Sequence, residues 1–338
     1  MKKAVILFNL GGPDKLDNVE PFLFNLFNDP AIISVPSIIR YPLAKFISKR
    51  RAPIAKNIYK EIGNKSPILE LTQNQAKSLE NSLSKKGNFK CFVVMRCWHP
   101  RAENVIKEVK EYNPEEIILL PLYPQYSAST SGSSIKEWND LCKKENYKVK
   151  TKIICCYPTE NNFLESHANL IKKTIKNLEN KDFKLLFSAH GLPEIKIKKG
   201  DPYQWQVEQT VEGIMSKLTN ENPNYIISYQ SRVGPLKWIG PSTDEVIIKY
   251  SKEKKGIVIV PVAFVSEHSE TLVELDIEYK KLAEKNGCSF YKRVPALGIE
   301  ENFIKGLTEL IVKKETKGNY VSSVMCPNKY SKCPCLSL

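Results

Sequence analysis

Two segments place polar side chains directly after an apolar run. In one, His190 follows the run 185–188 and precedes a Gly-Leu-Pro turn. The other, after the run 256–260, supplies three more side chains that can bind metal or move protons: Glu267, His268 and Glu270. In folds with parallel strands, ligands bind where the strands end. Imidazole with carboxylate suits either a divalent metal such as Fe²⁺ or Zn²⁺ or proton transfer, and the residues alone leave both open.

A row of carboxylates begins at the second segment. Glu270, Glu274 and Glu278 recur at every fourth position of an amphipathic stretch. An α-helix turns about 100° per residue, so the three side chains share one face. If the row is buried, the pKa values of its carboxyl groups are raised and it can pass protons or metal ions stepwise. The alternative is that the row is an ordinary solvated acidic face of the helix.

The elements that must position these residues alternate along the chain. Apolar runs without alternation predict eight buried strands, at 4–10, 91–95, 117–121, 152–155, 185–188, 225–228, 256–260 and 289–293. Amphipathic periodicity predicts helices at 19–28, 71–84, 102–112, 134–144, 163–178, 204–218, 244–251, 270–286 and 301–313. Strand–helix alternation predicts an α/β fold, and this many strands predict two doubly wound parallel sheets with a break near 147–150.

One stretch, 34–65, shows no clean helical period. It contains several prolines, large apolar side chains and the basic run Lys49-Arg50-Arg51. It follows the first strand–helix unit, so we expect an insertion at the carboxyl edge of the first sheet. It is either an ordinary packed excursion or an apolar lip, flanked by cations, over a pocket or against a membrane surface.

The composition leaves several partners possible. The chain has 338 residues, 51 basic and 37 acidic, for a net charge of +14, which suits nucleic acid, anionic lipid or an anionic small molecule. No nucleic-acid-binding motif is present. Nine cysteines are too few for a disulfide scaffold and favour a reducing compartment. No apolar run approaches the roughly 18 residues of a membrane span. The first apolar run lacks a cleavage pattern, so it predicts a buried strand and not a signal peptide.

The last part of the chain carries three cysteines in the pattern C-x6-C-x-C. Cys326, Cys333 and Cys335 lie close together in sequence. In a reducing compartment this spacing indicates ligation of a metal or an iron–sulfur cluster. A frayed tail with unligated thiols is the alternative.

Short motifs spread over nearly the whole chain carry a family resemblance. In order they are LGGP at 10–13, KRRAP at 49–53, SPI at 66–68, LPLYPQYS at 120–127, SAHGLP at 188–193, YQSRVGP at 229–235, WIGP at 238–241 and SEHSETL at 266–272. The chain resembles ferrochelatases, the lyases that insert Fe²⁺ into protoporphyrin IX in the last step of haem biosynthesis. The resemblance implies two flavodoxin- or Rossmann-like, chelatase-like lobes with the porphyrin cleft between them. The N-terminal lobe is expected at 1–149 and includes the lip at about 34–65. The C-terminal lobe is expected at 150–318, and a cysteine-containing tail follows at 319–338.

The resemblance also implies roles for the residues singled out above. His190 would face the macrocycle as base, metal ligand or both, and Glu270 would lie opposite it. His268 and Glu267 would support Glu270 through hydrogen bonds. Glu274 and Glu278 would form an acidic path leading away from the site. Removing two pyrrole protons and stripping water from Fe²⁺ are tasks that a histidine and a carboxylate row can serve.

A second set of positions matches the family's porphyrin contacts. The positions that would line the macrocycle are Leu10, Tyr59, Trp238 and Phe264. The positions that would supply polar contacts are Arg51 and Ser66, to a propionate, and Arg96. An aromatic residue is usual after the last of these, but Cys97 stands here. Some ferrochelatases carry a [2Fe–2S] cluster on C-terminal cysteines and one internal cysteine near the Gln-Tyr-Ser segment. That segment has no cysteine here, so the internal ligand would be Cys142, Cys155 or Cys156.

The expected partners are protoporphyrin IX and Fe²⁺, the latter as substrate, and no nucleic acid is expected. The protein is expected in the cytoplasm, with peripheral contact at the inner face of the cell membrane. Rival interpretations are a chelatase for another tetrapyrrole, such as coproporphyrin, or for Co²⁺, and a two-lobed haem carrier. A carrier would not need the pair His190 and Glu270. A nucleic-acid binder would have to show salt-sensitive binding.

Overall fold

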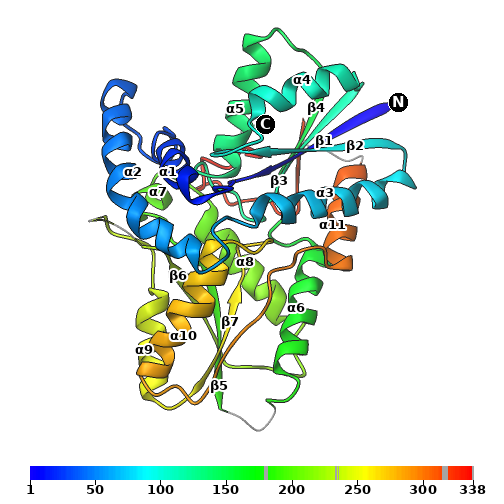
Figure 1. Cartoon of the computed structure of the whole chain (residues 1–338). Coiled ribbons are helices and arrows are strands. Elements are labelled where there is room, and N and C mark those ends of the chain that lie inside the picture. The colour runs from blue at the N-terminus through cyan, green and yellow to red at the C-terminus, as the bar shows by residue number, and fades with distance from the viewer. Residues whose placement is uncertain (179–181, 233, 235, 314–318, 337–338) are drawn as a thin grey trace. The chain divides into compact units, whose positions relative to one another are not determined.

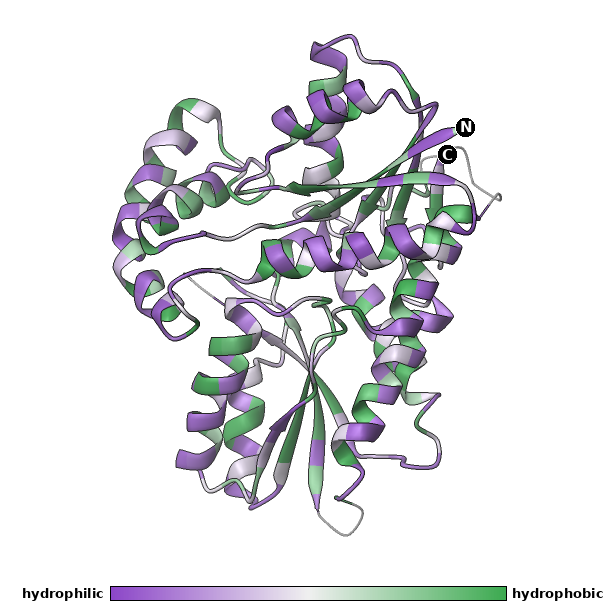
Figure 2. Ribbon diagram, turned by 45° about the vertical axis from the view of Figure 1, so that its right-hand side comes forward, coloured by the Kyte–Doolittle hydropathy of each residue, from purple (hydrophilic) through white to green (hydrophobic). Residues whose placement is uncertain are grey.

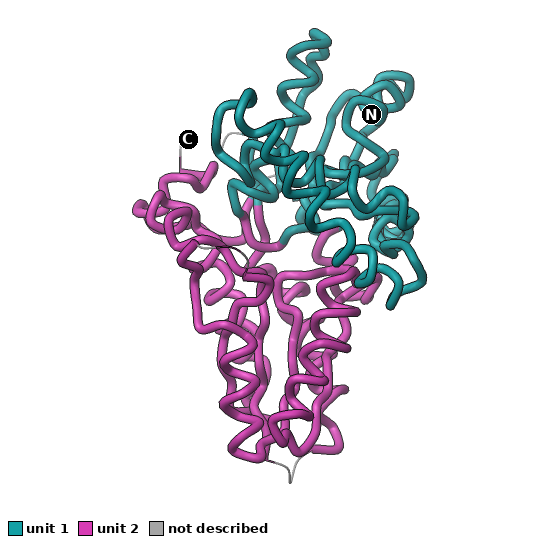
Figure 3. The backbone as a smooth tube through the Cα atoms, turned by 60° about the vertical axis from the view of Figure 1, so that its left-hand side comes forward, with its two compact units in different colours: residues 1–123, 127–155, 308–321 teal, residues 124–126, 156–307, 322–338 magenta. Residues whose placement is uncertain are grey.

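The computed structural model describes residues 1–178, 182–232, 234, 236–313 and 319–336. These residues form two compact units (Figure 3). Unit 1 comprises 1–123, 127–155 and 308–321, and unit 2 comprises 124–126, 156–307 and 322–338. The expected boundary at 318 falls in 314–318, outside the described residues, and the domain limits given above stay predictions.

Unit 1 is built on a sheet with the strand order β2-β1-β3-β4-β9 (Figure 1). Its strands are β1 (Lys2–Asn9), β2 (Asn88–Met95), β3 (Glu116–Pro121), β4 (Lys150–Cys156) and β9 (Tyr320–Ser322). β1 pairs in parallel with β2 and with β3, and β3 pairs in parallel with β4. One face of the sheet is covered by α4 (Ala102–Tyr112) and α5 (Ser131–Lys144), and Trp138 of α5 stands edge-on to Phe8 at 6.0 Å between ring centroids.

The remaining helices of this unit are the short η1 (Leu16–Asn18), α1 (Val19–Phe27), α2 (Ser37–Lys60) and α3 (Ile68–Ser84). Most of the stretch 34–65, for which no helix was predicted, is α2, and it contains Pro42 and Pro53. Periodicity did not indicate this helix because the amphipathicity of α2 is reversed. Its buried positions are mostly small, with Ala44, Ser48 and Ala52 among them, while its large apolar side chains are exposed.

Unit 2 repeats the same strand order in a smaller sheet, β6-β5-β7-β8, and all three pairs are parallel. Its strands are β5 (Phe183–His190), β6 (Tyr225–Gln230), β7 (Gly256–Pro261) and β8 (Tyr291–Arg293). Figure 2 shows that these strands are largely apolar, as strands covered on both faces are. The order reverses between β5 and β7, the switch point where doubly wound sheets bind their ligands.

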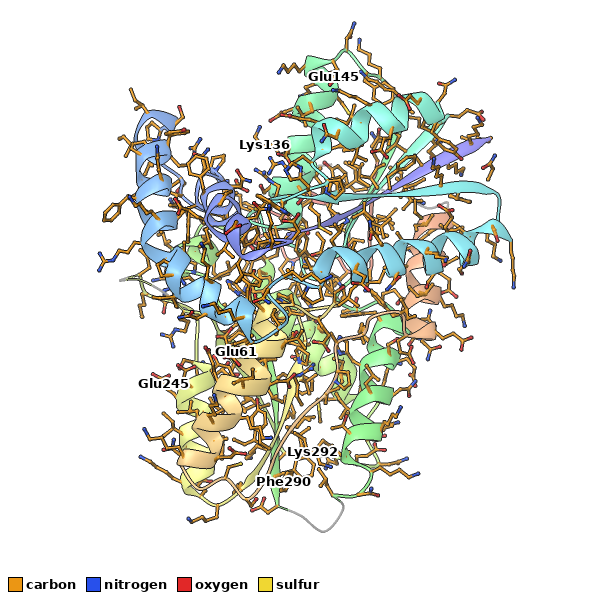
Figure 4. All side chains as sticks on the ribbon, viewed as in Figure 1. Glu61, Lys136, Glu145, Glu245, Phe290 and Lys292 are labelled. Atoms are coloured by element: carbon orange, nitrogen blue, oxygen red, sulfur yellow. The ribbon has the colours of Figure 1, made fainter. Side chains whose placement is uncertain are left out.

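The helices of unit 2 are α6 (Asn161–Ile175), α7 (Glu194–Lys198), α8 (Tyr203–Met215), α9 (Thr243–Lys252), the π-helix η2 (Glu270–Glu278) and α10 (Tyr279–Lys285), while α11 (Glu301–Val312) ends in unit 1. One face of the sheet packs on α9, η2 and α10. A capping box of Ser242 and Glu245 begins α9, and Glu245 is labelled in Figure 4. Gly256 is the first residue of β7, and the ring of Phe290 occupies the space that a Cβ would need there (Figure 4).

The predicted α/β fold with two parallel sheets is confirmed, and all eight predicted strands are present. Besides α2, the prediction missed the short elements η1, α7 and β9. It was also wrong about the first half of the helix at 270–286, because Glu270–Glu278 is a π-helix that continues into α10. A π segment is rare and is frequently found at functional sites.

Candidate active site

His190 is the last residue of β5, at the switch point of the unit 2 sheet. The next residue is Gly191, and a Cβ there would lie 2.9 Å from the carbonyl oxygen of Gln230 and 3.2 Å from the ring of Trp238. A glycine therefore lets the chain turn close to the end of β6. This packing accounts for the Gly-Leu-Pro turn and fixes where the imidazole leaves the strand.

Glu270, the first residue of η2, bonds to His190. Its Oε2 lies 2.8 Å from His190 Nδ1. His268 Nε2 lies 3.9 Å from Oε1 of the same carboxylate, beyond hydrogen-bond range, and His268 Nδ1 lies 3.1 Å from the Ser266 carbonyl oxygen. The side chains of His190 and Glu270 are 40% and 24% exposed, so the pair remains accessible to a ligand.

Ser231, the residue after β6, joins the first two carboxylates of the acidic row. Its hydroxyl lies 3.2 Å from Glu270 Oε2 and 2.6 Å from Glu274 Oε2. Glu274 also accepts hydrogen bonds from the Ser231 N–H at 3.0 Å, the Gln230 amide at 2.8 Å and the Tyr279 hydroxyl at 3.0 Å. The third carboxylate, Glu278, is exposed. The row thus runs from a half-buried pair to the surface of η2.

The pKa values of this group move in opposite directions. Burial acts to raise the pKa of Glu270, but the positive charge and hydrogen bond of His190 outweigh it and hold that pKa at about 2. Burial acts to lower the pKa of His190, and the charge of Glu270 reverses this and raises it. For Glu274, burial and the nearby charge of Glu270 both raise the pKa. The site therefore holds an ionised carboxylate, a strengthened base and a carboxyl group that readily takes a proton.

Of the other predicted site residues of unit 2, Glu267 bonds to partners other than Glu270. Glu267 accepts from Arg293 at 2.8 Å and from the Ala296 N–H at 2.9 Å, and Arg293 also pairs with Asp276. The Phe264 ring lies 4.7 Å from the His268 ring between centroids. Trp238 forms an antiparallel bridge with Pro193, next to the turn after β5. Val233 and Pro235 of the 229–235 motif lie outside the described residues.

The predicted porphyrin contacts of unit 1 surround the turn after β1. Leu10 and Tyr59 belong to one apolar cluster with Cys97 and Trp98. A Cβ on Gly12 would lie 2.5 Å from Ser66, so the LGGP and SPI motifs pack directly on each other. Gly11 has φ +86°, a left-handed conformation that favours glycine. Arg51 is exposed on α2, with its guanidinium 5.9 Å from the Phe27 ring centroid.

Arg96 follows β2 and contacts three polar side chains of unit 1. Its guanidinium lies 3.0 Å from Asp29, 3.0 Å from Glu137 and 2.8 Å from the Ser133 hydroxyl. Arg101 also contacts Glu137, at 2.6 Å. Two cations and two carboxylates therefore balance one another in a largely buried network.

The three tail cysteines are all buried in unit 2, near the end of β4. Gln206 of α8 donates from Nε2 to Cys326 Sγ at 3.2 Å and to Cys156 Sγ at 3.4 Å. Cys333 interacts through its thiol with both Cys326 and Cys335. The tail is also fastened by Trp205 and Tyr330, whose rings stack at 5.6 Å between centroids. Through the side chain of Gln206, Cys156, one of the three internal cysteine candidates, is thus linked directly to the tail.

Among the described residues, no group of three or more His, Cys, Asp and Glu side chains is arranged to hold a metal ion. No helix in the described part of the chain is long and apolar enough to cross a membrane.

The structure brings together His190, Glu270 and Glu274, which the sequence had singled out. Sequence reasoning missed the residues that bind their carboxylates, Ser231, Gln230 and Tyr279. The first two lie in the YQSRVGP motif, which was a usable signal. Nothing in the local pattern marked Tyr279, because it reaches Glu274 from a buried position at the start of α10.

Comparison with known proteins gives one consistent result. The model of the family Ferrochelatase matches residues 2–315. A protein of Pelagibacter ubique named Ferrochelatase is 65% identical over 100% of this chain and 99% of its own length. A Rickettsia bellii protein of the same name is 48% identical over 99% of this chain and 95% of its own length.

Solved structures of similar fold are far more distant in sequence. SirB from Bacillus subtilis with Fe³⁺ is 14% identical with a TM-score of 0.55, over 92% of this chain and 94% of SirB. A multi-domain Deinococcus radiodurans protein, described as structurally similar to chelatases, is 9% identical with a TM-score of 0.50, over 94% of this chain and 56% of that chain. At such identities the likeness concerns the fold alone.

Proposed function

This chain belongs to the ferrochelatase family, and on that premise we propose that it inserts Fe²⁺ into protoporphyrin IX to give protohaem. It is a lyase of haem biosynthesis, and both the porphyrin and Fe²⁺ are its substrates. The observation that best supports our assignment of the site is the 2.8 Å contact between His190 and Glu270 at the switch point of the unit 2 sheet.

His190 acts as the base that removes a pyrrole proton. Because the Glu270 carboxylate is ionised, it accepts a hydrogen bond, and His190 carries its own hydrogen on Nδ1. That leaves the Nε2 lone pair to take a proton, and the nearby negative charge strengthens it as a base. Glu270 then stabilises the imidazolium that forms. A lone pair on Nε2 can equally ligate Fe²⁺, so this nitrogen serves as base, ligand or both.

The acidic row carries released protons away from the site. Insertion of Fe²⁺ displaces two pyrrole protons, and Glu274 has the raised pKa that a proton acceptor needs. Ser231 contacts Glu270 and Glu274 at once, so its hydroxyl can relay a proton between them. Glu278, exposed further along η2, completes the path to solvent.

An anaerobic absorbance assay with protoporphyrin IX and Fe²⁺ tests this function. We expect the four visible bands of the metal-free porphyrin to be replaced by the two bands of the metalloporphyrin. Glu270→Ala should abolish the change, while Glu278→Gln, an exposed carboxylate of the same helix, serves as the matched control. No metallation by the wild-type protein would refute the proposal, as would full activity of Glu270→Ala.

Porphyrin recognition in unit 1 rests on the turn after β1 and on α2. Leu10 and Tyr59 offer apolar contact, and Ser66 and Arg51 offer polar contact for a propionate. The exposed guanidinium of Arg51 is available for an anion. Arg51→Ala should raise the Kd for porphyrin more than it lowers turnover at saturation. An unchanged Kd would remove Arg51 from the propionate contact. In unit 2 we assign apolar contacts to Trp238 and Phe264, which lie beside the elements that carry His190 and His268.

We further propose that the cysteine group of unit 2 holds a [2Fe–2S] cluster. The support is chemical: the cysteine ligand set is complete if Cys156 joins the three tail cysteines, and Gln206 contacts Cys156 and Cys326 together. A cluster spreads its four thiolates over two irons, a wider arrangement than three ligands around one ion. Anaerobic reconstitution of the whole chain should give cluster absorbance at visible wavelengths, and Cys156→Ser should remove it. Unchanged absorbance in Cys156→Ser would exclude that residue as the fourth ligand.

Peripheral contact with an anionic membrane is a separate proposal, supported by α2. Several of its large apolar side chains are exposed, with Ile38 at 83%, Phe46 at 63% and Ile54 at 67%. Exposed cations, including Lys49 and Arg50, accompany them. Such a helix can insert apolar side chains while its cations bind anionic headgroups. In flotation with anionic vesicles the protein should rise with the lipid, and Phe46→Ser should weaken this. Recovery away from the vesicles would contradict the proposal.

A further inference from the structure

Gln206 is a buried amide whose polar atoms are directed at sulfur and at the main chain. It lies on α8, where no part of its side chain is exposed. Nε2 lies 3.2 Å from Cys326 Sγ and 3.4 Å from Cys156 Sγ. These two cysteines are far apart in sequence, one at the end of β4 and one in the tail. Gln206 is therefore a side chain that bridges the internal cysteine and the tail.

The orientation of this amide follows from its third contact. Oε1 lies 2.7 Å from the main-chain nitrogen of Tyr126. A main-chain N–H can only donate, so the oxygen of the amide must face it and the NH₂ group must face the sulfurs. The NH₂ group has two hydrogens, one for each Sγ. Gln125, next to Tyr126, donates to Thr210 of α8 at 3.0 Å and so ties this segment to the same helix.

We propose that Gln206 sets the reduction potential of the [2Fe–2S] cluster by donating hydrogen bonds from one amide group to the sulfurs of two of its ligands. This inference rests on the cluster proposed above. Reduction adds negative charge to the cluster, and hydrogen bonds to ligand sulfur stabilise that charge. The amide therefore raises the potential. It is a positioning and tuning residue, since it contacts the ligands and not the substrates.

The test compares the midpoint potential of the cluster in whole-chain variants, reconstituted anaerobically and titrated by absorbance. Gln206→Leu removes the donor, and the potential should shift to more negative values. Gln206→Glu keeps the length and the acceptor for Tyr126 but replaces the donor by a carboxylate, and the shift should be larger. Gln209→Leu is the matched control, because that glutamine lies on the same helix and bonds instead to Glu212 at the surface.

The outcomes separate this inference from the cluster itself. A wild-type chain without cluster absorbance overturns the cluster and the role of Gln206 with it, while the iron-insertion assay still decides the main function. A wild-type cluster whose potential is unchanged in both Gln206 variants overturns the inference and leaves the cluster standing. If neither variant holds a cluster, pulsed EPR of the reduced wild-type protein with ¹⁵N in its glutamine side chains decides. A ¹⁵N coupling that persists in Gln209→Leu supports the hydrogen bonds, and its absence overturns them.

Discussion

Each of the two sheets of this protein carries a polar group at the carboxyl end of a strand, and the charges of the two groups are balanced in different ways. In unit 1, Arg96 follows β2 and meets Asp29 and Glu137, with Arg101 as a second cation. In unit 2, His190 ends β5 and meets Glu270, with Glu274 close behind. The first group pairs permanent charges one to one. The second places two carboxylates around a group whose charge depends on its protonation.

This difference separates a structural network from a reactive one. The side chains of Arg96 and Asp29 are only 13% and 3% exposed, and their charges are paired with each other. His190 is 40% exposed, and its neighbours shift its pKa upward while they hold that of Glu270 at about 2. A polar cluster at a strand end becomes chemically useful when it remains accessible and when its protons are not fully committed.

The largest expected effect concerns the reactive group. His190→Ala removes the base and should lower the rate of Fe²⁺ insertion by about 10²- to 10⁴-fold, the usual contribution of a positioned acid or base. Because the side chain is 40% exposed, the melting temperature should hardly change. Porphyrin binding, measured by fluorescence quenching, should persist. Retained turnover would show that His190 is not the base.

The opposite pattern is expected for the structural group. Arg96→Leu leaves Asp29 and Glu137 buried without this partner, and the free energy of unfolding should fall by about 3–5 kcal/mol. Urea denaturation measures this. The control is Lys136→Ala, which removes an exposed i,i+4 pair with Asp140 and should cost no more than about 0.5 kcal/mol (Figure 4). Equal losses in the two variants would contradict the contrast between the two pairs.

A third histidine shows what happens when no carboxylate is nearby. His167 of α6 is fully buried, neither ring nitrogen has a hydrogen-bond partner among the described residues, and burial lowers its pKa to about 3 from 6.5. Below pH 6.5 the unfolded chain binds a proton that the folded chain refuses, so stability is complete above that pH and is lost as pH falls towards 3.

The variant His167→Leu should remove this contribution to the pH dependence. Wild-type stability should fall by up to about 1.4 kcal/mol per pH unit more steeply than that of the variant in this window. Urea midpoints measured at a series of pH values test the prediction. Parallel pH profiles for the two proteins would show that His167 does not contribute.

The smallest effect is expected at the end of the acidic row. Glu278 is exposed, so bulk water can replace its carboxylate as a proton acceptor. Glu278→Gln should change the insertion rate by less than about twofold, whereas Glu274→Gln, at a position with four hydrogen bonds, should change it by about tenfold or more. Equal effects of the two substitutions would contradict a path that runs outward along η2.

Much of the fold could be predicted from the chain because the strands are continuous apolar runs. β9 was not predicted because Tyr320–Ser322 is three residues long and has no such run. α2 was not predicted because its buried face consists largely of small residues, among them Ala44, Ser48 and Ala52. Its large apolar side chains are exposed, which is the reverse of the pattern that helical periodicity detects. The stretch is helical because its small residues pack against the rest of unit 1, and a local sequence pattern does not show such packing.

The site was predictable at its strand ends and less so in its contacts. His190 and Glu270 could be named from their position after apolar runs, with support from family motifs. The two carboxylates that Ser231 contacts lie on a π-helix, where the sequence pattern had predicted an ordinary α-helix. The role of Gln206 depends on a contact between β4 and the tail, which no local pattern contains.

A double-mutant cycle on the insertion rate tests the central claim that His190 and Glu270 act as one unit. Wild type, His190→Ala, Glu270→Gln and the double variant would be assayed with porphyrin and Fe²⁺ at saturation. Since each residue supports the other's protonation state, we expect each single substitution to cost nearly as much as both together. Losses that multiply in the double variant would show that the two side chains work independently and would contradict the account.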